Sequence, residues 1–248
     1  MWEAGCTGRQ RESILGAGQG QGGIMLLAVM LLFLEPAVAI PIHAIAQLAS
    51  NSSRTLVHLR AVRRDLLFPY LILLLPAGML SLPLTRHADP DLLRAAIGLF
   101  VLVASWRRDW LLLGFDPEKI PLTPRFTLVG GLAGSLGPVV GATGPLIAPF
   151  FLGLELTRFE LIGTTAACRA TGHLAKIVLF GTDGFEFGVH APLYLGMILA
   201  VVLGTSLGTK LLAYIPEERF PVIFKTALTA VALRLVWSGV SALVFQGS

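Results

Sequence analysis

The sequence predicts an all-α integral membrane protein, a multi-pass helical bundle of two related repeats with glycine-rich discontinuous or re-entrant helices. Composition is the first observation behind this prediction. The chain has 248 residues, of which 54% are hydrophobic and 14% charged, and its mean hydropathy is +0.75. Soluble domains are less apolar and carry about 25% charged residues. The second observation is an apolar stretch broken by glycine and proline, and the third is an earlier copy of it.

The broken stretch runs from Gly130 to Lys176 and reads GGLAGSLGPVVGATGPLIAPFFLGLELTRFELIGTTAACRATGHLAK. Its apolar runs are long enough for a membrane, but glycines and prolines interrupt them: Gly134, Gly137, Pro138, Gly141, Gly144, Pro145 and Pro149. In a helix interior, glycine costs about 1 kcal/mol and proline about 3. Non-helical backbone at membrane depth is tolerated only where protein or a water-filled cavity covers it. Transporters use such breaks to aim helix ends at a substrate.

The helix predicted after this break carries Arg169, His173 and Lys176 on one face, at positions i, i+4 and i+7. An offset of 122 residues (144 minus 22) aligns an earlier segment with it without a gap. The offset pairs Gly22 with Gly144, His43 with Thr165, Gln47 with Arg169, Asn51 with His173 and Arg54 with Lys176. Two copies of a glycine-rich break followed by a polar-faced helix indicate an internal duplication.

The start of the chain departs from this plan. Residues 1–15 are polar, whereas the second break is preceded by the apolar run Phe126–Leu136. We therefore expect residues 1–15 to be a non-membrane segment that is truncated, misassigned or diverged. The first break, GAGQGQGG, leads into the short apolar run Ile24–Leu34. That run has the length of a signal-peptide core, but the repeat alignment continues through the cleavage-like Ala37-Val38-Ala39, which favours a half-helix.

The first repeat is predicted over residues 16–114, as a break and three spans: Ala37–Val57, Leu66–Leu84 and Leu92–Leu113. The loop after the first span holds His58, Arg60, Arg63 and Arg64. Such a basic loop is expected on the cytoplasmic side. The linker over residues 115–125 is weakly basic and should lie on the same side. Its prolines, Pro117, Pro121 and Pro124, predict a non-helical connection.

The second repeat is predicted over residues 126–245, as a break and three spans: Phe159–Phe180, Ala191–Tyr214 and Val222–Phe245. Asp183 and Glu186 make the loop after its first span acidic, opposite in charge to the equivalent loop of the first repeat. This favours repeats inserted upside down, which requires a re-entrant hairpin and three spans in each. A kinked spanning helix at the break would instead give parallel repeats. Gly204 and Gly208 form a GxxxG step suited to close helix packing.

Two cations within one predicted span are the clearest functional signal. A charged residue at mid-membrane costs about 2.5 to 3.5 kcal/mol, so Arg169 and Lys176 would oppose insertion by about 5 to 7 kcal/mol if neither is paired. One interpretation places them near helix ends or beside a carboxylate on another helix, such as Glu35 or Glu155. The other makes them counter-ions for an anion, helped by half-helix N-termini and backbone amides at the break. His173 is either a proton relay or a hydrogen-bonded packing residue.

Other function classes find little support in the sequence. Cys6 and Cys168 have no zinc-type spacing, so neither a disulfide framework nor a metal site is predicted. GAGQGQGG lacks the context of a dinucleotide fingerprint and the Lys-Ser/Thr of a phosphate loop, so no cofactor is predicted. The net charge of +4 sits mostly in short loops and signals topology rather than nucleic-acid binding. Paired carboxylates that would indicate an enzyme are absent from the predicted helices.

The breaks and the helices after them carry a family resemblance. The segments GAGQGQGGIMLL, AIPIHAIAQLASNSSR, GSLGPVVGATGPLIAPF and ELIGTTAACRATGHLAK resemble the sulfite exporter family, often labelled TauE/SafE. The similarity extends over nearly everything after Gly16. It implies a multi-pass protein of the plasma (inner) membrane, with two related halves, that moves small sulfur-containing anions such as sulfite or organosulfonates, often outward.

The repeat pattern and this resemblance together give a predicted substrate-binding set: Gly22, Gly23, Gln47, Asn51, Arg54, Gly141, Thr143, Gly144, Pro145, Thr165, Arg169, His173 and Lys176. The expected partners are the lipid bilayer and a small anion. A non-transporting membrane scaffold or assembly protein is the alternative function. The sequence leaves open the substrate, the direction of transport, the coupling ion and the oligomeric state.

Overall fold

The computed structural model describes residues 22–112, 114, 116–151, 153–200 and 220–246. These residues form helices joined by turns, and no strand occurs among them. The prediction of an all-α protein is therefore confirmed. Residues 1–21, with the predicted non-membrane start and most of the first break, lie outside the described part, and so do Gly204 and Gly208.

In the first half of the chain, helices lie close to the predicted ranges. A short helix over 22–30 precedes α2 (Pro36–Val57), η1 (Leu59–Ala61), α3 (Arg64–His87) and α4 (Pro90–Trp106). Both α2 and α4 begin with proline, whose missing N–H costs nothing at the first helical position. The span predicted to reach Leu113 is shorter, because α4 ends at Trp106 where charged residues begin, and η2 (Arg108–Leu112) follows.

The second half contains η3 (Pro117–Lys119), α5 (Leu122–Val140), α6 (Gly144–Ile147), η4 (Ala148–Phe151), α7 (Arg158–Thr182), η5 (Phe187–His190) and α9 (Phe220–Gln246). Residues 191–200 are also helical, and residues 201–219, with the rest of the predicted span Ala191–Tyr214, lie outside the described part. A capping box starts α7: the Thr157 hydroxyl accepts from the Glu160 backbone N–H while the Glu160 carboxylate accepts from that of Thr157.

Helix α5 differs from the prediction at both ends. It begins at Leu122, inside the stretch predicted to be a non-helical linker, because Pro124 falls in the first turn, where no N–H is needed. The prediction that Gly134, Gly137 and Pro138 interrupt the apolar run is wrong, since α5 continues to Val140. Gly134 has a packing reason: a Cβ there would lie 2.2 Å from the carbonyl oxygen of Leu74 on α3.

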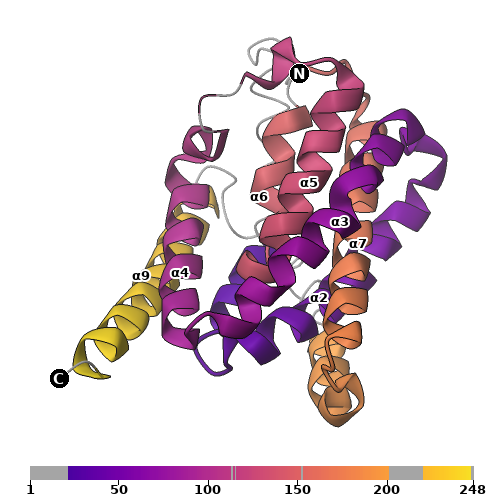
Figure 1. Ribbon diagram of the computed structural model, residues 1–248. Coiled ribbons are helices and arrows are strands. Elements are labelled where there is room, and N and C mark those ends of the chain that lie inside the picture. Colours follow the sequence, from indigo (N-terminus) through magenta and orange to yellow (C-terminus); the bar gives the residue numbers. More distant parts are fainter. Residues whose placement is uncertain (1–21, 113, 115, 152, 201–219, 247–248) are drawn as a thin grey trace.

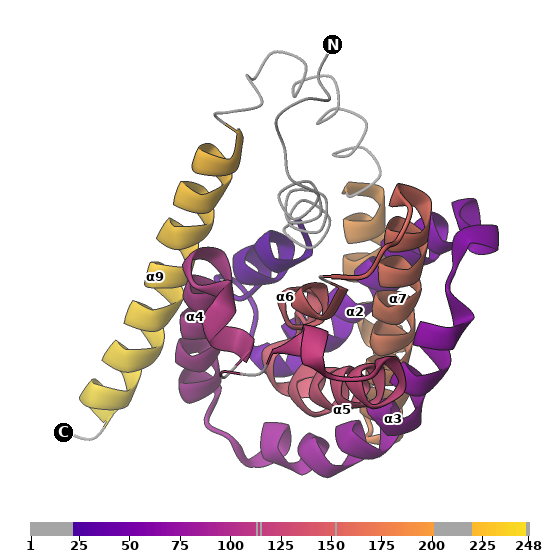
Figure 2. The same cartoon turned by 90° about the horizontal axis from the view of Figure 1, so that it is seen from above.

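Three pairs of helices make the most extensive contacts among the described residues: α3 with α5, α4 with α9, and α2 with α7. Glycines allow two of these pairs to approach closely. Added Cβ atoms would meet the Tyr70 carbonyl oxygen at Gly130 on α5 and the Asp91 carbonyl oxygen at Gly239 on α9. Figure 1 shows α4 and α9 as a pair on one side of the bundle, and Figure 2 shows α6 lying among the other helices.

Helices α2 and α7 run in opposite directions. The carbonyl oxygen of His58, the C-cap of α2, would lie 3.0 Å from a Cβ on Gly163 near the start of α7, and Pro36 at the start of α2 lines a cavity together with Asp183 at the end of α7. Arg63, at the start of α3, also lies near the start of α7: its backbone N–H donates to Thr164 Oγ1 and its guanidinium is 4.0 Å from Glu160 Oε1. At the other end, Arg86 of α3 forms an ion pair with Asp183, which caps the end of α7. We call these the Arg63 end and the Asp183 end of the bundle. The basic loop and the acidic loop therefore lie at opposite ends, separated by the length of α7, about 37 Å for its 25 residues.

Two described helices are long and apolar enough to cross a membrane by length and composition: Arg64–His87 and Val222–Val244. Much of the apolar surface of α3 is exposed, including Phe68, Ile72, Met79, Leu80 and Leu84. A soluble protein rarely exposes so much contiguous apolar surface, whereas a lipid-facing helix does so by necessity.

Candidate functional site

The second glycine-rich break lies at Gly141–Thr143, between α5 and α6. Gly141 adopts φ 76°, a left-handed conformation that a glycine takes without strain. A Cβ at this position would also meet Leu27 Cδ2 at 2.7 Å. The break frees the Gly141 carbonyl from the helix, and the Lys176 ammonium on α7 donates to this oxygen at 2.5 Å. Lys176 therefore satisfies the carbonyl that ends α5.

The chain reverses direction at this break. Phe126 near the start of α5 packs edge-to-face against Phe151 at the end of η4, with ring centroids 5.0 Å apart. Gly153 lies against Glu118 of η3, which precedes α5. The segment that enters as α5 from the Arg63 end thus returns to that end as α6 and η4, and its turning point lies inside the bundle (Figure 1).

The polar faces of α2 and α7 meet at this turning point and form a central pocket. Its lining comes from both breaks and both polar-faced helices: Gly23, Ile24, His43, Gln47, Asn51, Ala142, Thr143, Gly144, Arg169 and His173. The volume of this cavity is about 20 Å³, about the space that one ordered water needs. No carboxylate belongs to this lining.

Hydrogen bonds order the α2 side of the central pocket. The Asn51 amide donates to the backbone carbonyl of Gln47 at 2.8 Å and to the Gln47 side-chain oxygen at 3.4 Å. His43 Nε2 lies 2.8 Å from the Gly23 carbonyl oxygen. A Cβ added to Gly23 would lie 3.0 Å from Gln47 Oε1, so glycine leaves room for this amide beside the backbone.

The structure brings together seven of the predicted substrate-binding residues in the central pocket: Gly23, Gln47, Asn51, Thr143, Gly144, Arg169 and His173. The other six lie outside its lining. Arg54 is exposed in the last turn of α2, and Thr165 donates from its hydroxyl to the Leu161 carbonyl within α7. Gly22 and Gly141 belong to the two breaks, Pro145 follows the second break, and Lys176 bonds to Gly141 as described.

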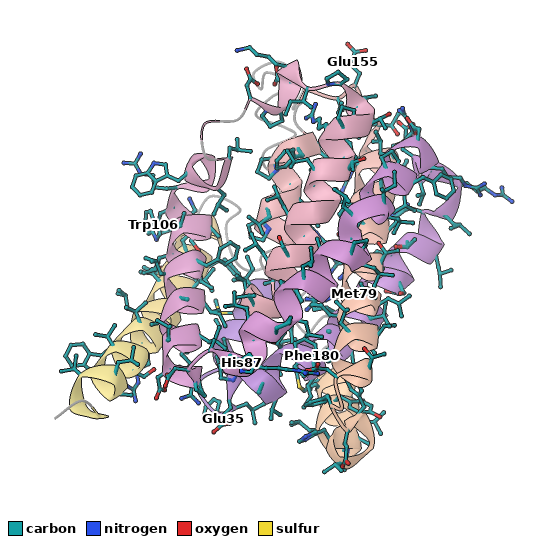
Figure 3. All side chains as sticks on the ribbon, in the orientation of Figure 1. Glu35, Met79, His87, Trp106, Glu155 and Phe180 are labelled. Carbon is teal, nitrogen blue, oxygen red and sulfur yellow. The ribbon has the colours of Figure 1, made fainter. Side chains whose placement is uncertain are left out.

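Burial argues against the interpretation that places the two interior cations near helix ends. Arg169 is 5% exposed and Lys176 2% exposed, so neither reaches the surface. Glu35 and Glu155, the carboxylates considered as partners, are exposed at opposite ends of the bundle (Figure 3). Both cations therefore belong to the interior, at the level of the break.

Three residues of the pocket lining, Ile24, His43 and Ala142, were absent from the predicted set, and His43 is the polar one among them. It packs edge-on against His173, with ring centroids 5.7 Å apart. The available signal was its place on the polar face of α2, one turn before Gln47. Because the repeat offset pairs His43 with Thr165, it was ranked below His173 as a candidate proton relay and left out of the predicted set.

A larger cavity of about 260 Å³ lies toward the Asp183 end. Its lining includes Pro36, Ile40, Arg86, Pro138 and Asp183. Ile40 precedes His43 by about one turn of α2, and Pro138 precedes Gly141 by one turn of α5. The larger cavity and the central pocket are therefore about one helical turn apart along α2 and α5.

A family model described as sulfite exporter TauE/SafE matches residues 13–235, which includes both breaks, both polar-faced helices and every residue of the central pocket. The chain belongs to the sulfite exporter TauE/SafE family. This family consists of integral membrane transporters. No curated protein and no solved structure matches the chain.

Membership of the sulfite exporter family confirms the resemblance read from the breaks and establishes membrane transport as the general function. Family membership also supports the prediction that the protein is not an enzyme, and it does not favour the alternative of a non-transporting scaffold.

Proposed function

We propose that this protein is a multi-pass transporter of the inner membrane that exports small sulfur oxyanions, sulfite or a short organosulfonate, through the central pocket. One observation carries the proposal: Arg169 is buried among neutral polar groups in a pocket that both breaks and both polar-faced helices line. A membrane protein retains a buried arginine, at a cost of about 2.5 to 3.5 kcal/mol, where function requires it.

The lining suits an oxyanion. The Arg169 guanidinium offers a planar fork of donors that can hold two oxygens at once. The amides of Gln47 and Asn51 and the Thr143 hydroxyl can donate to further oxygens. The small volume favours sulfite over bulkier sulfonates. It also implies that the helices separate when the anion enters.

We propose further that the two halves, residues 16–114 and 126–245, are inverted repeats. The equivalent helices α2 and α7 are antiparallel, which supports this arrangement. The hairpin formed by α5, α6 and η4 supports a re-entrant break with three spans following it. With the basic loop cytoplasmic, the Arg63 end faces the cytoplasm and the Asp183 end faces outward. The larger cavity then lies on the outward half of the path.

Binding of labelled sulfite to purified protein tests the proposal. Arg169→Gln should weaken binding about tenfold to a hundredfold, because a charge-assisted hydrogen bond contributes about 1.5 to 3 kcal/mol. Arg169→Lys should retain part of the affinity, since lysine keeps the charge and loses the fork. Arg234→Gln, which removes an exposed arginine from α9, is the matched control and should bind like the wild type. Equal affinity in all four proteins would refute the assignment of Arg169.

A further inference from the structure

Two histidines from the equivalent helices meet in the wall of the central pocket. His43 of α2 and His173 of α7 are both buried, with ring planes 72° apart. The Nδ1 atom of each ring has no hydrogen-bond partner among the described residues. Buried polar atoms are normally satisfied, so two such atoms in one site point to a ligand or a proton that completes them.

The hydrogen bond of His43 fixes which nitrogen is free to act as a base. A carbonyl oxygen can only accept, so Nε2 of His43 must donate its proton to Gly23. The neutral ring then carries a bare lone pair on Nδ1, buried and without a donor. His43 is thus held with one nitrogen occupied and the other ready to take a proton.

The groups around this pair are neutral or positive in the described part of the chain. Helix α7 contributes Arg169, Lys176 and the Cys168 thiol, and α3 contributes the Tyr70 phenol. The other neighbours are neutral: the Gln47 and Asn51 amides, the Thr143 hydroxyl and the Gly23 carbonyl. No carboxylate is buried in this part of the chain. Two cations therefore oppose an extra positive charge at this site, and an anion bound in the pocket removes that opposition.

We propose that His43 takes up a proton when the anion binds, so that the site carries an oxyanion and a proton together. This inference rests on the proposed function and names its coupling ion. The proton adds to the Nδ1 lone pair, and the new N–H donates to an oxygen of the anion. His173, in contact with the ring of His43, carries the second unpartnered Nδ1 and also lines the central pocket.

Such coupling is reciprocal: if the anion promotes proton uptake, protons promote anion binding by the same factor. With one proton taken up per anion, affinity falls up to tenfold for each pH unit as pH rises through the range where His43 loses its proton. Transport would then respond to a pH difference across the membrane as well as to the anion gradient.

Calorimetric titration of the purified full chain tests this inference. Sulfite is titrated at one pH in two buffers of different ionisation enthalpy, which reports the protons taken up per anion. The same titrations are made with His43→Gln, whose amide can still donate to the Gly23 carbonyl but cannot take a proton. His87→Gln is the matched control, because His87 is exposed at the Asp183 end (Figure 3). The protonation of sulfite itself is common to all three proteins. Differences between them in the number of protons taken up therefore report the proton bound by His43.

We expect the wild type and His87→Gln to take up about one more proton per bound anion than His43→Gln, which should bind more weakly. The affinity of the wild type for methanesulfonate, whose charge is constant near neutral pH, should also fall as pH rises. Sulfite binding with the same proton count in wild type and His43→Gln would overturn the inference and leave the proposed function intact. If His43→Gln does not fold, a pH-independent methanesulfonate affinity of the wild type overturns it. Failure of the wild type to bind either anion would overturn both.

Discussion

Gly130 and Gly131 are adjacent on α5, and the structure predicts opposite effects of placing alanine at each. A Cβ at Gly130 would lie 1.8 Å from the Tyr70 carbonyl oxygen. Contacts between carbon and carbonyl oxygen need about 3.3 Å, so α3 and α5 would have to separate by about 1.5 Å. A Cβ at Gly131 would lie 3.5 Å from Leu73, which is an ordinary contact.

The magnitudes follow from these distances. Overpacking costs about 1 to 3 kcal/mol, and a clash with backbone belongs at the upper end because no side chain can move away. Alanine in place of a helical glycine gains about 1 kcal/mol. We therefore expect Gly130→Ala to be destabilised by about 2 kcal/mol and Gly131→Ala to be stabilised by about 1 kcal/mol. At about 2 to 4 °C per kcal/mol, their melting temperatures should differ by about 6 to 12 °C.

Thermal unfolding of both variants in the same detergent, followed by tryptophan fluorescence, measures this difference. Sulfite binding should also fall in Gly130→Ala, because α5 carries the break that supplies Thr143 to the central pocket. Equal melting temperatures for the two variants would refute the close packing of α3 on α5. A lower melting temperature for Gly131→Ala than for Gly130→Ala would show that the facing surfaces of α5 have been assigned in reverse.

Three further predictions concern topology and the site. Cysteines placed at Arg60 and Glu186, in a background of Cys6→Ser and Cys168→Ala, should react with an impermeant thiol reagent from opposite sides of the membrane. Labelling of both cysteines from the same side would exclude inverted repeats. Gly144→Leu should abolish sulfite flux in proteoliposomes while membrane insertion and yield are retained, because the side chain fills the pocket; normal flux would place the path elsewhere. Lys176→Gln should weaken sulfite binding less than Arg169→Gln, because Lys176 donates to the Gly141 carbonyl and a glutamine amide can replace that bond. A larger loss of affinity in Lys176→Gln would make Lys176 the main counter-ion.

The sequence by itself determined much of this protein. Apolar runs of membrane length predicted the helices, and the ranges of α2, α3, α7 and α9 agree with the prediction within a few residues. Local rules suffice here, since hydrophobicity and helix-starting residues act within a few positions of the chain. The spacing of polar residues along two segments also identified four members of the central pocket, Gln47, Asn51, Arg169 and His173, because a helical face is fixed by sequence separation alone.

Only the tertiary structure decided how those faces meet. Nothing in the spacing of residues shows that α2 and α7 cross so that His43 touches His173, or that Lys176 turns to the Gly141 carbonyl while Arg169 lines the pocket. The end of α5 at Val140, past Gly134 and Pro138, was equally beyond local rules, because contact with α3 makes glycine favourable inside that helix. Helix propensities describe only how a residue behaves within its own segment of the chain. The partner of a buried side chain depends on which segments pack together, and that is a property of the whole chain.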